Sequence, residues 1–292
     1  MNGLIMTISI RKTLAAIAFV CVGAVGAFII YDRIPEVDPI PKNGPLAALP
    51  MANGSSEPFG AAVPNPAGIT WMNDSSSYLV STDDRVLAEV SADFKTVIWQ
   101  MTVPASPLGT GDTEGVAYLG NNRAAVIGER GVVILMKRSA TGWEETERFA
   151  IKGMVAGTQL GSAAYDPETN TLFSAQKTGE KRLYRINLET QATEVVSMIL
   201  SPKLAVTAGR DWTEFTIAGL GFVDGKLLAN SEAFSSVLTI QTSGEVNEVH
   251  GINNINEAAG LTIRNDHIIL VGDAESYLPE PPIYLIPRAD KF

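Results

Sequence analysis

The sequence predicts an all-β fold, a single β-propeller of five or six four-stranded blades that follows an N-terminal transmembrane helix. Three observations support this prediction. A short phrase with a central glycine recurs along the chain, a similar pair of apolar strands follows each copy, and one long apolar run lies near the N-terminus. Repeats of about 40 to 50 residues are typical of propeller blades and are longer than the heptad or the helical-pair repeat of about 34 residues.

The recurring phrase has a small or acidic residue, then glycine, and then alternating apolar and small residues that end on an aromatic or aliphatic side chain. Its copies are Ala67-Gly68-Ile69-Thr70-Trp71, Glu114-Gly115-Val116-Ala117-Tyr118, Gly161-Ser162-Ala163-Ala164-Tyr165, Ala218-Gly219-Leu220-Gly221-Phe222 and Ala259-Gly260-Leu261-Thr262-Ile263. After each copy come two short apolar strands bounded by Gly, Asn, Asp and Pro turns, a pattern that predicts antiparallel meanders. Six blades stay open as well as five, because residues 191–217 are long enough for further strands.

The apolar run extends from Leu14 to Ile30 and contains no charged residue. With one more residue at each end it spans roughly 28 Å as a helix, close to the thickness of a bilayer core. Arg11 and Lys12 precede it and Asp32 follows it, so the positive-inside rule places the N-terminus in the cytoplasm. We predict a cytoplasmic stub and signal-anchor helix in residues 1–31, with residues 13–31 in the inner membrane and the C-terminal domain in the periplasm. Cleavage within this segment is the alternative.

Between the anchor and the repeats, residues 32–63 are rich in proline. Of the 16 prolines in the chain, half lie between Pro35 and Pro66. Proline spaced by Gly, Asn and Ser favours an extended tether. We therefore expect no strands in residues 32–63 and assign residues 64–292 to the propeller.

Charge and residue types exclude several function classes. The net charge of -10 argues against nucleic acid as a partner. The single cysteine, Cys21, lies in the apolar run, so the exported domain has no disulfide. No nucleophile elbow, zinc-protease motif or phosphate loop is present, and the only histidines are His250 and His267.

Polar residues recur at two equivalent places in the repeats. Three residues before each glycine position stand Asn65, Asp112, Gln159, Thr216 and Glu257. At the end of each second strand stand Asp83 with Asp84, Glu129, Gln176 with Lys177, Glu232, and Asp273. Equivalent positions of propeller blades gather at one channel mouth.

Carboxylates around a channel mouth suit a hard cation or a polyhydroxy or cationic ligand. We expect ligand contacts from Asp83, Asp112, Glu129, Glu232 and Asp273, and metal contacts from Glu114 and Glu257, with Ca²⁺ as the candidate ion. The alternative is that these acids only cap turns, where Asp and Asn are common.

Two segments resemble the SdiA-regulated, YjiK-like family of bacterial envelope propellers. They are Asp112 to Gly120 with Arg123 to Arg130, and Ala164 to Phe173; Asn65 to Thr70 resembles the first blade of that family. The resemblance covers roughly residues 64–288 and implies an envelope propeller with an N-terminal membrane segment and a divalent cation in the channel. The chain departs from the family pattern at Gly161-Ser162 and at Ala259, where acids are expected.

Two functional classes follow from these observations. The first is a membrane-anchored periplasmic propeller that binds a small-molecule or protein ligand. The second is a metal-dependent hydrolase similar to the gluconolactonase and senescence-marker propellers, in which bound metal activates water. Those enzymes have an acid before the first glycine, where this chain has Ala67. Binding is therefore the favoured class.

Overall fold

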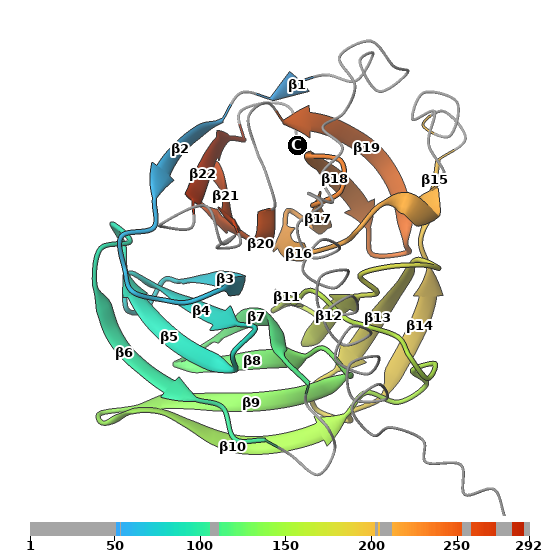
Figure 1. Ribbon diagram of the computed structural model, residues 1–292. Helices are drawn as coiled ribbons and strands as arrows, with labels where there is room; N and C mark the ends of the chain where they lie inside the picture. The colour runs from blue at the N-terminus through green and yellow to red at the C-terminus, as the bar shows by residue number, and fades with distance from the viewer. Residues whose placement is uncertain are drawn as a thin grey trace, which may run out of the picture. The chain divides into compact units, whose positions relative to one another are not determined.

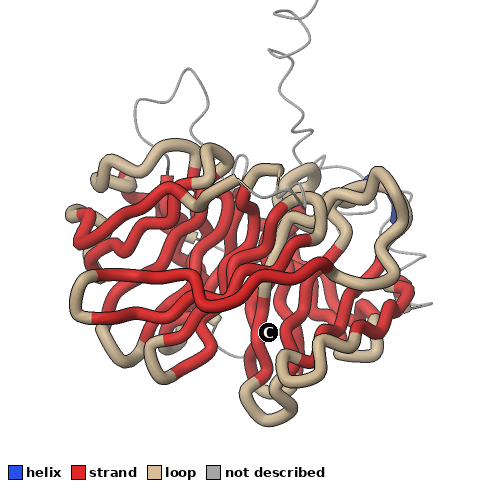
Figure 2. The backbone as a smooth tube through the Cα atoms, turned by 90° about the horizontal axis from the view of Figure 1, so that it is seen from below, coloured by secondary structure: helices blue, strands red, loops and turns tan. Residues whose placement is uncertain are grey.

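The structure is a computed structural model that describes residues 51–52, 54–105, 111–201, 204, 212–252, 258–272 and 282–288. Five β-sheets stand around a common centre, as Figure 1 shows. Figure 2 shows that strands and loops account for nearly all of this part of the chain; the short 3-10 helix η2 (Trp212–Glu214) is an exception. The predicted transmembrane segment lies outside the described residues, and within them no helix has the length and apolar character that a membrane span requires.

The first three blades are antiparallel meanders that run in chain order from the centre outward. The first contains β3 (Pro66–Met72), β4 (Ser77–Thr82), β5 (Val86–Ser91) and β6 (Val97–Thr102). The second contains β7 (Thr113–Gly120), β8 (Arg123–Gly128), β9 (Val132–Ser139) and β10 (Gly142–Ala150). The third contains β11 (Ala164–Asp166), β12 (Thr171–Ala175), β13 (Arg182–Asn187) and β14 (Thr193–Ser197). Each blade begins with one copy of the glycine phrase, as predicted.

The fourth blade carries two additional short strands at its outer edge. Its meander contains β16 (Gly219–Val223), β17 (Lys226–Ser231), β18 (Ser236–Gln241) and β19 (Glu245–Ile252). Strands β1 (Met51–Ala52) and β15 (Ile199–Leu200) both pair with β19 in parallel. The long range 191–217 therefore contributes edge strands to existing sheets, and the blade number is five.

The fifth blade is completed by the N-terminal side of the domain. Strands β20 (Ala258–Arg264), β21 (His267–Gly272) and β22 (Pro282–Pro287) follow one another, and β2 (Ser55–Pro58) pairs antiparallel with β22. Strands β1 and β2 both lie inside the range for which we expected a tether without strands, so that expectation is wrong for residues 51–52 and 55–58. The proline-rich composition was a poor guide because strand pairing uses backbone groups. Pro58 stands at the end of β2, where the missing N–H of proline does little harm.

The core lies between adjacent blades. One cluster joins Leu79 and Leu87 of the first blade to Val126, Ile134 and Trp143 of the second, and all five side chains are buried. The middle strands are buried on both faces, since each sheet packs against two neighbours. They consequently lack the alternation of a sheet with one solvent-exposed face.

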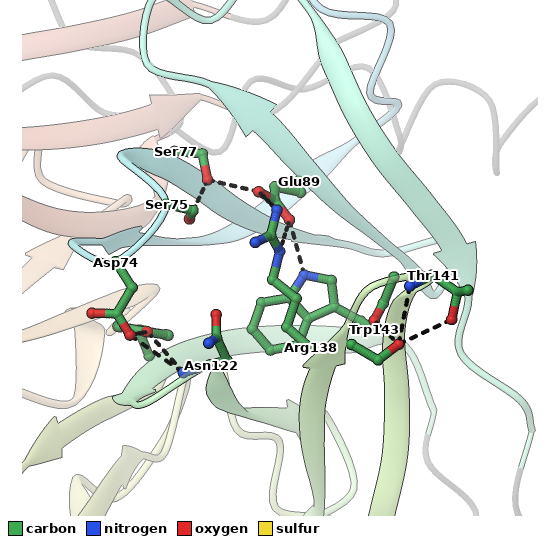
Figure 3. A network of polar contacts seen from close by, with 11 residues as sticks. Asp74, Ser75, Ser77, Glu89, Asn122, Arg138, Thr141 and Trp143 are labelled. Atoms are coloured by element: carbon green, nitrogen blue, oxygen red, sulfur yellow. Dashed lines mark hydrogen bonds and ion pairs between the residues drawn. The ribbon is translucent and has the colours of Figure 1, made fainter.

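A buried carboxylate also ties the first two blades together (Figure 3). Glu89, whose side chain is 1% exposed, accepts two hydrogen bonds from the Arg138 guanidinium, at 2.9 Å each. The Trp143 indole N–H donates to it at 3.1 Å and the Ser77 hydroxyl at 2.9 Å. Four donors thus satisfy the charge, as a buried carboxylate requires.

Candidate functional site

The glycines of the phrase close the propeller channel. A Cβ atom added at Gly68 would lie 2.2 Å from the Glu114 carbonyl oxygen, and one at Gly115 would lie 2.3 Å from the Ser162 carbonyl carbon. These are backbone atoms of the next inner strand, which cannot move aside without moving a blade. The space between the inner strands at this level leaves no room for a water molecule. The channel therefore has two separate mouths.

In the first three blades, the two sets of polar positions that the repeats predicted lie at one mouth. In three consecutive blades, a backbone N–H just after the second strand donates to the carbonyl oxygen of the residue three places before the glycine position. The bonds join Asp83 to Asn65 at 3.2 Å, Glu129 to Asp112 at 2.9 Å, and Lys177 to Gln159 at 2.9 Å. Because the same bond recurs from blade to blade, equivalent side chains reach the same mouth.

Glu114 lies at the centre of this acidic mouth. It stands on β7 directly before Gly115, is 6% exposed, and its Oε2 atom is 3.7 Å from the Nζ atom of Lys177. Burial raises the pKa of Glu114 to about 7; Lys177 acts to lower it, and the charges of Asp83, Glu129 and Asp112 raise it further. The desolvation cost and the three acids thus outweigh the single ammonium group.

The structure therefore brings together four residues that the sequence singled out, namely Asp83, Asp112, Glu114 and Glu129. Glu232 is partly buried directly after β17, the second strand of its own blade. Glu257 and Asp273 lie outside the described residues. Among the residues that the structure does describe, no three or more Asp, Glu, His or Cys side chains are arranged to hold a metal ion. The Ca²⁺ site, which also involves Glu257, stays a prediction.

Lys177 is the residue of this mouth that sequence reasoning missed. It follows β12 (Thr171–Ala175) at the position equivalent to Asp83 and Glu129, but a cation among acids was not assigned a role. At this mouth a side-chain hydrogen bond also connects the second and third blades, from Gln159 Nε2 to Glu129 Oε1 at 2.6 Å. The sequence did contain a signal for Lys177, namely its position in the repeat. Equivalent positions of the blades lie at the same mouth, whatever side chain they carry.

The opposite mouth is lined by the ends of the phrases. Trp71, Tyr118, Tyr165, Phe222 and Ile263 surround a cavity of about 350 Å³. All five side chains are partly buried. The sequence showed that every phrase ends on a large side chain, but this regularity was used only to count blades.

Comparison with known proteins supports the fold. No protein-family model matches the chain, and no curated protein matches it. The glutaminyl cyclase of Myxococcus xanthus has a similar structure, with a TM-score of 0.57 and 16% identity over 82% of this chain and 97% of that one. The PQQ-bound aldose sugar dehydrogenase of Streptomyces coelicolor gives a TM-score of 0.49 and 13% identity over 81% and 99%. At 16% identity the likeness to the glutaminyl cyclase concerns the fold alone, and the chain is a five-bladed β-propeller.

Proposed function

We propose that the protein is a periplasmic binding propeller, anchored in the inner membrane by residues 13–31, whose acidic mouth binds a cationic ligand. The observation that carries this proposal is the environment of Glu114. This carboxyl is 6% exposed and has a pKa of about 7 in the company of three further acids. Such a strongly perturbed, buried carboxyl is more typical of a binding or catalytic site than of a turn.

The charge balance at the mouth favours a cation. When all are ionised, the four acids outnumber the one ammonium group of Lys177. An arriving cation gains from the combined field of several carboxylates. The same field repels anionic ligands, which agrees with the net charge of the chain, -10.

Binding of a cation should release a proton from Glu114. A positive charge beside the carboxylate favours its ionised form, so the ligand lowers the pKa of this group. With a pKa of about 7 in the free protein, Glu114 is roughly half protonated at neutral pH. We therefore expect about half a proton to be released per bound cation at pH 7.

Isothermal titration calorimetry tests this mechanism directly. The full chain in non-ionic detergent is titrated at pH 7 with CaCl₂ and, separately, with spermidine, in two buffers of different ionisation enthalpy. The buffer dependence of the heat gives the number of protons released. Glu114→Gln should abolish the release from this group and weaken binding about tenfold or more, since it replaces a charged contact by a neutral one.

The matched control is Glu189→Gln, which removes an exposed acid from the turn between β13 and β14. It should bind both cations as the natural chain does. If neither cation binds, or if Glu114→Gln binds them unchanged, the acids serve only as turn and solubility residues. Binding of CaCl₂ alone would support the predicted calcium site.

Topology is tested by reporter fusions after residue 60. A periplasmic reporter should be active and a cytoplasmic reporter silent, with the full-length chain in the membrane fraction. The appearance of a soluble species that lacks the first 27 residues would instead indicate a cleaved signal peptide.

The hydrolase remains a second candidate because of one observation. A carboxyl with a pKa of about 7 is poised to accept and donate protons near neutral pH, as general acid–base catalysis requires. Carboxylate oxygens are ligands that a divalent metal prefers, but the described acids are not arranged around one metal position. Lactone and phosphoester substrates tested with added metal decide the question: turnover that is lost in Glu114→Gln supports the enzyme, whereas cation binding without turnover supports the binding protein.

A further inference from the structure

The cup at the second mouth, formed by Trp71, Tyr118, Tyr165, Phe222 and Ile263, is independent of the acidic mouth. The glycine level of the channel separates the two, with no room for water between the inner strands. Its volume of about 350 Å³ lies within the range of small-molecule sites. Binding in the cup therefore does not depend on the cation site.

The rings of the cup are held in fixed orientations by their own polar atoms. The Trp71 indole N–H donates to Asn73 Oδ1 at 2.7 Å, and the Tyr165 hydroxyl donates to Asn170 Oδ1 at 2.9 Å. The Tyr118 hydroxyl donates to Asp74. Each acceptor lies in a turn, so the polar tips of these rings are satisfied by the protein. Arg264 covers one face of the Trp71 ring and Phe173 stacks on Phe222, while the five side chains together line the cavity.

Two of these rings are fixed further. The Arg264 guanidinium lies 4.1 Å from the centroid of the Trp71 ring and also donates to the Tyr78 hydroxyl at 3.1 Å. Burial, followed by the hydrogen bond to Asp74, raises the pKa of Tyr118 to about 12, so this phenol stays a hydrogen-bond donor at any physiological pH. Rings that are ordered before binding lose little conformational entropy when a ligand arrives.

Inner strands are also bonded to one another at the level of the cup. The Thr70 hydroxyl oxygen accepts the backbone N–H of Tyr118 at 3.1 Å, and the Thr262 hydroxyl oxygen accepts that of Trp71 at 2.9 Å. These bonds join the fifth blade to the first and the first to the second. The aromatic side chains thus stand on a backbone that is tied across three blades.

The rim of the cup adds one hydrogen-bond donor and one hydrogen-bond acceptor. Asn73 and Asp74 are exposed residues of the turn after β3, and both line the cavity. Asn73 Oδ1 and Asp74 Oδ2 accept the bonds described above, while Asn73 Nδ2 and Asp74 Oδ1 have no hydrogen-bond partner within the described part of the chain. An amide donor and a carboxylate acceptor side by side match the hydroxyl groups of a polyol, each of which both donates and accepts.

From this arrangement we infer that the cup binds a neutral sugar, with the apolar C–H face of a pyranose ring on the aromatic side chains and its hydroxyl groups on Asn73 and Asp74. A purely apolar ligand would make no use of the rim donor and acceptor. A quaternary ammonium ion would use the rings by cation–π attraction and the Asp74 carboxylate by its charge, but it would make no use of the Asn73 amide donor. The sugar uses both features.

Saturation-transfer NMR on the full chain in detergent tests the inference. The probes are glucose, galactose, N-acetylglucosamine, cellobiose and chitobiose, with tetramethylammonium as the cation–π probe. We expect transfer to at least one saccharide, strongest at the axial C–H protons of one ring face. Transfer to tetramethylammonium alone, or to no probe at millimolar concentration, would overturn the inference.

Variants then locate the site. Tyr165→Ala should weaken saccharide binding about tenfold or more, which corresponds to about 1.4 kcal/mol, and Tyr165→Phe, which restores the ring, should recover most of that loss. Asn73→Ala should weaken binding through the lost rim donor. Ile98→Ala, at a side chain that is 51% exposed on the outer strand β6, is the neutral control.

Cation binding at the other mouth should be unchanged in the cup variants, so failure of one site is distinguishable from failure of the other. Circular dichroism confirms that each variant is folded. If Tyr165→Ala does not fold, Asn73→Ala and Asp74→Asn in the exposed turn give the same test. Saccharide binding that none of these substitutions changes would place the sugar elsewhere and refute the assignment.

Discussion

Substitution of Glu114 by glutamine should change how the stability of the protein depends on pH. The carboxyl has an ordinary pKa of 4.5 and a pKa of about 7 in the folded protein. The folded state therefore binds the proton more tightly than the unfolded state. Stability from this group is fully present below pH 4.5 and is lost as the pH rises through 7.

The expected magnitude follows from the two pKa values. Their difference corresponds to about 3 kcal/mol at ~1.4 kcal/mol per pH unit. Glutamine carries no charge at any pH, so the variant does not lose this stability on going to alkaline pH. Relative to the natural chain, Glu114→Gln should gain about 3 kcal/mol between pH 4 and pH 8, with the change centred between 4.5 and 7.

The assay is urea denaturation of both proteins, followed by tryptophan fluorescence at several pH values from 4 to 8.5. Only the difference between the two free energies of unfolding is interpreted, because most other titrating groups contribute equally to both proteins. Glu189→Gln should run parallel to the natural chain. A difference for Glu114→Gln that stays constant within about 0.5 kcal/mol over this range would refute the argument that burial and neighbouring acids destabilise the ionised form.

Three further perturbations test the architecture. Glu89→Ala removes the acceptor of four hydrogen bonds and should destabilise the fold by about 3 to 5 kcal/mol in urea denaturation; a loss below 1 kcal/mol would mean that solvent already screens the pair with Arg138. Gly115→Ala places a Cβ atom 2.3 Å from the Ser162 backbone and should cost roughly 3 kcal/mol or prevent folding, which a thermal melt close to that of the natural chain would contradict. Replacement of Ser55–Pro58 by a glycine–serine segment should leave β22 as an open edge and promote aggregation, as seen by size-exclusion chromatography; a monomeric, cooperatively unfolding variant would show that ring closure does not need β2.

The blade pattern could be predicted because a propeller repeats the same local arrangement of strands and turns. The phrase around Gly68 and Gly115 recurs since inner strands pass close to one another there, and a Cβ atom at either glycine would meet the neighbouring backbone. The strand pairs recur since each sheet buries both faces. The convergence of Asp83, Asp112 and Glu129 followed from blade equivalence, without knowledge of any side-chain contact.

Other features of the structure could not be predicted from the local sequence. Strand β2 forms because β22 needs a backbone partner, and backbone pairing is indifferent to the proline-rich composition that predicted a tether. The role of Lys177 depends on its distance from Glu114, which is 63 residues earlier in the chain. The cup, likewise, combines side chains from five blades, and each of them alone reads as an ordinary strand end.

The amino-acid sequence by itself determined the all-β class, the repeat and the acidic character of one mouth, because these depend on periodicity and composition, which are local properties. The tertiary structure decided the blade number, the closure by β2, the closed channel and the pKa of Glu114. These depend on which backbones approach one another across the ring and on how much water they exclude. Desolvation and charge proximity act through space, so two mouths with different chemistry exist only once the five blades have closed.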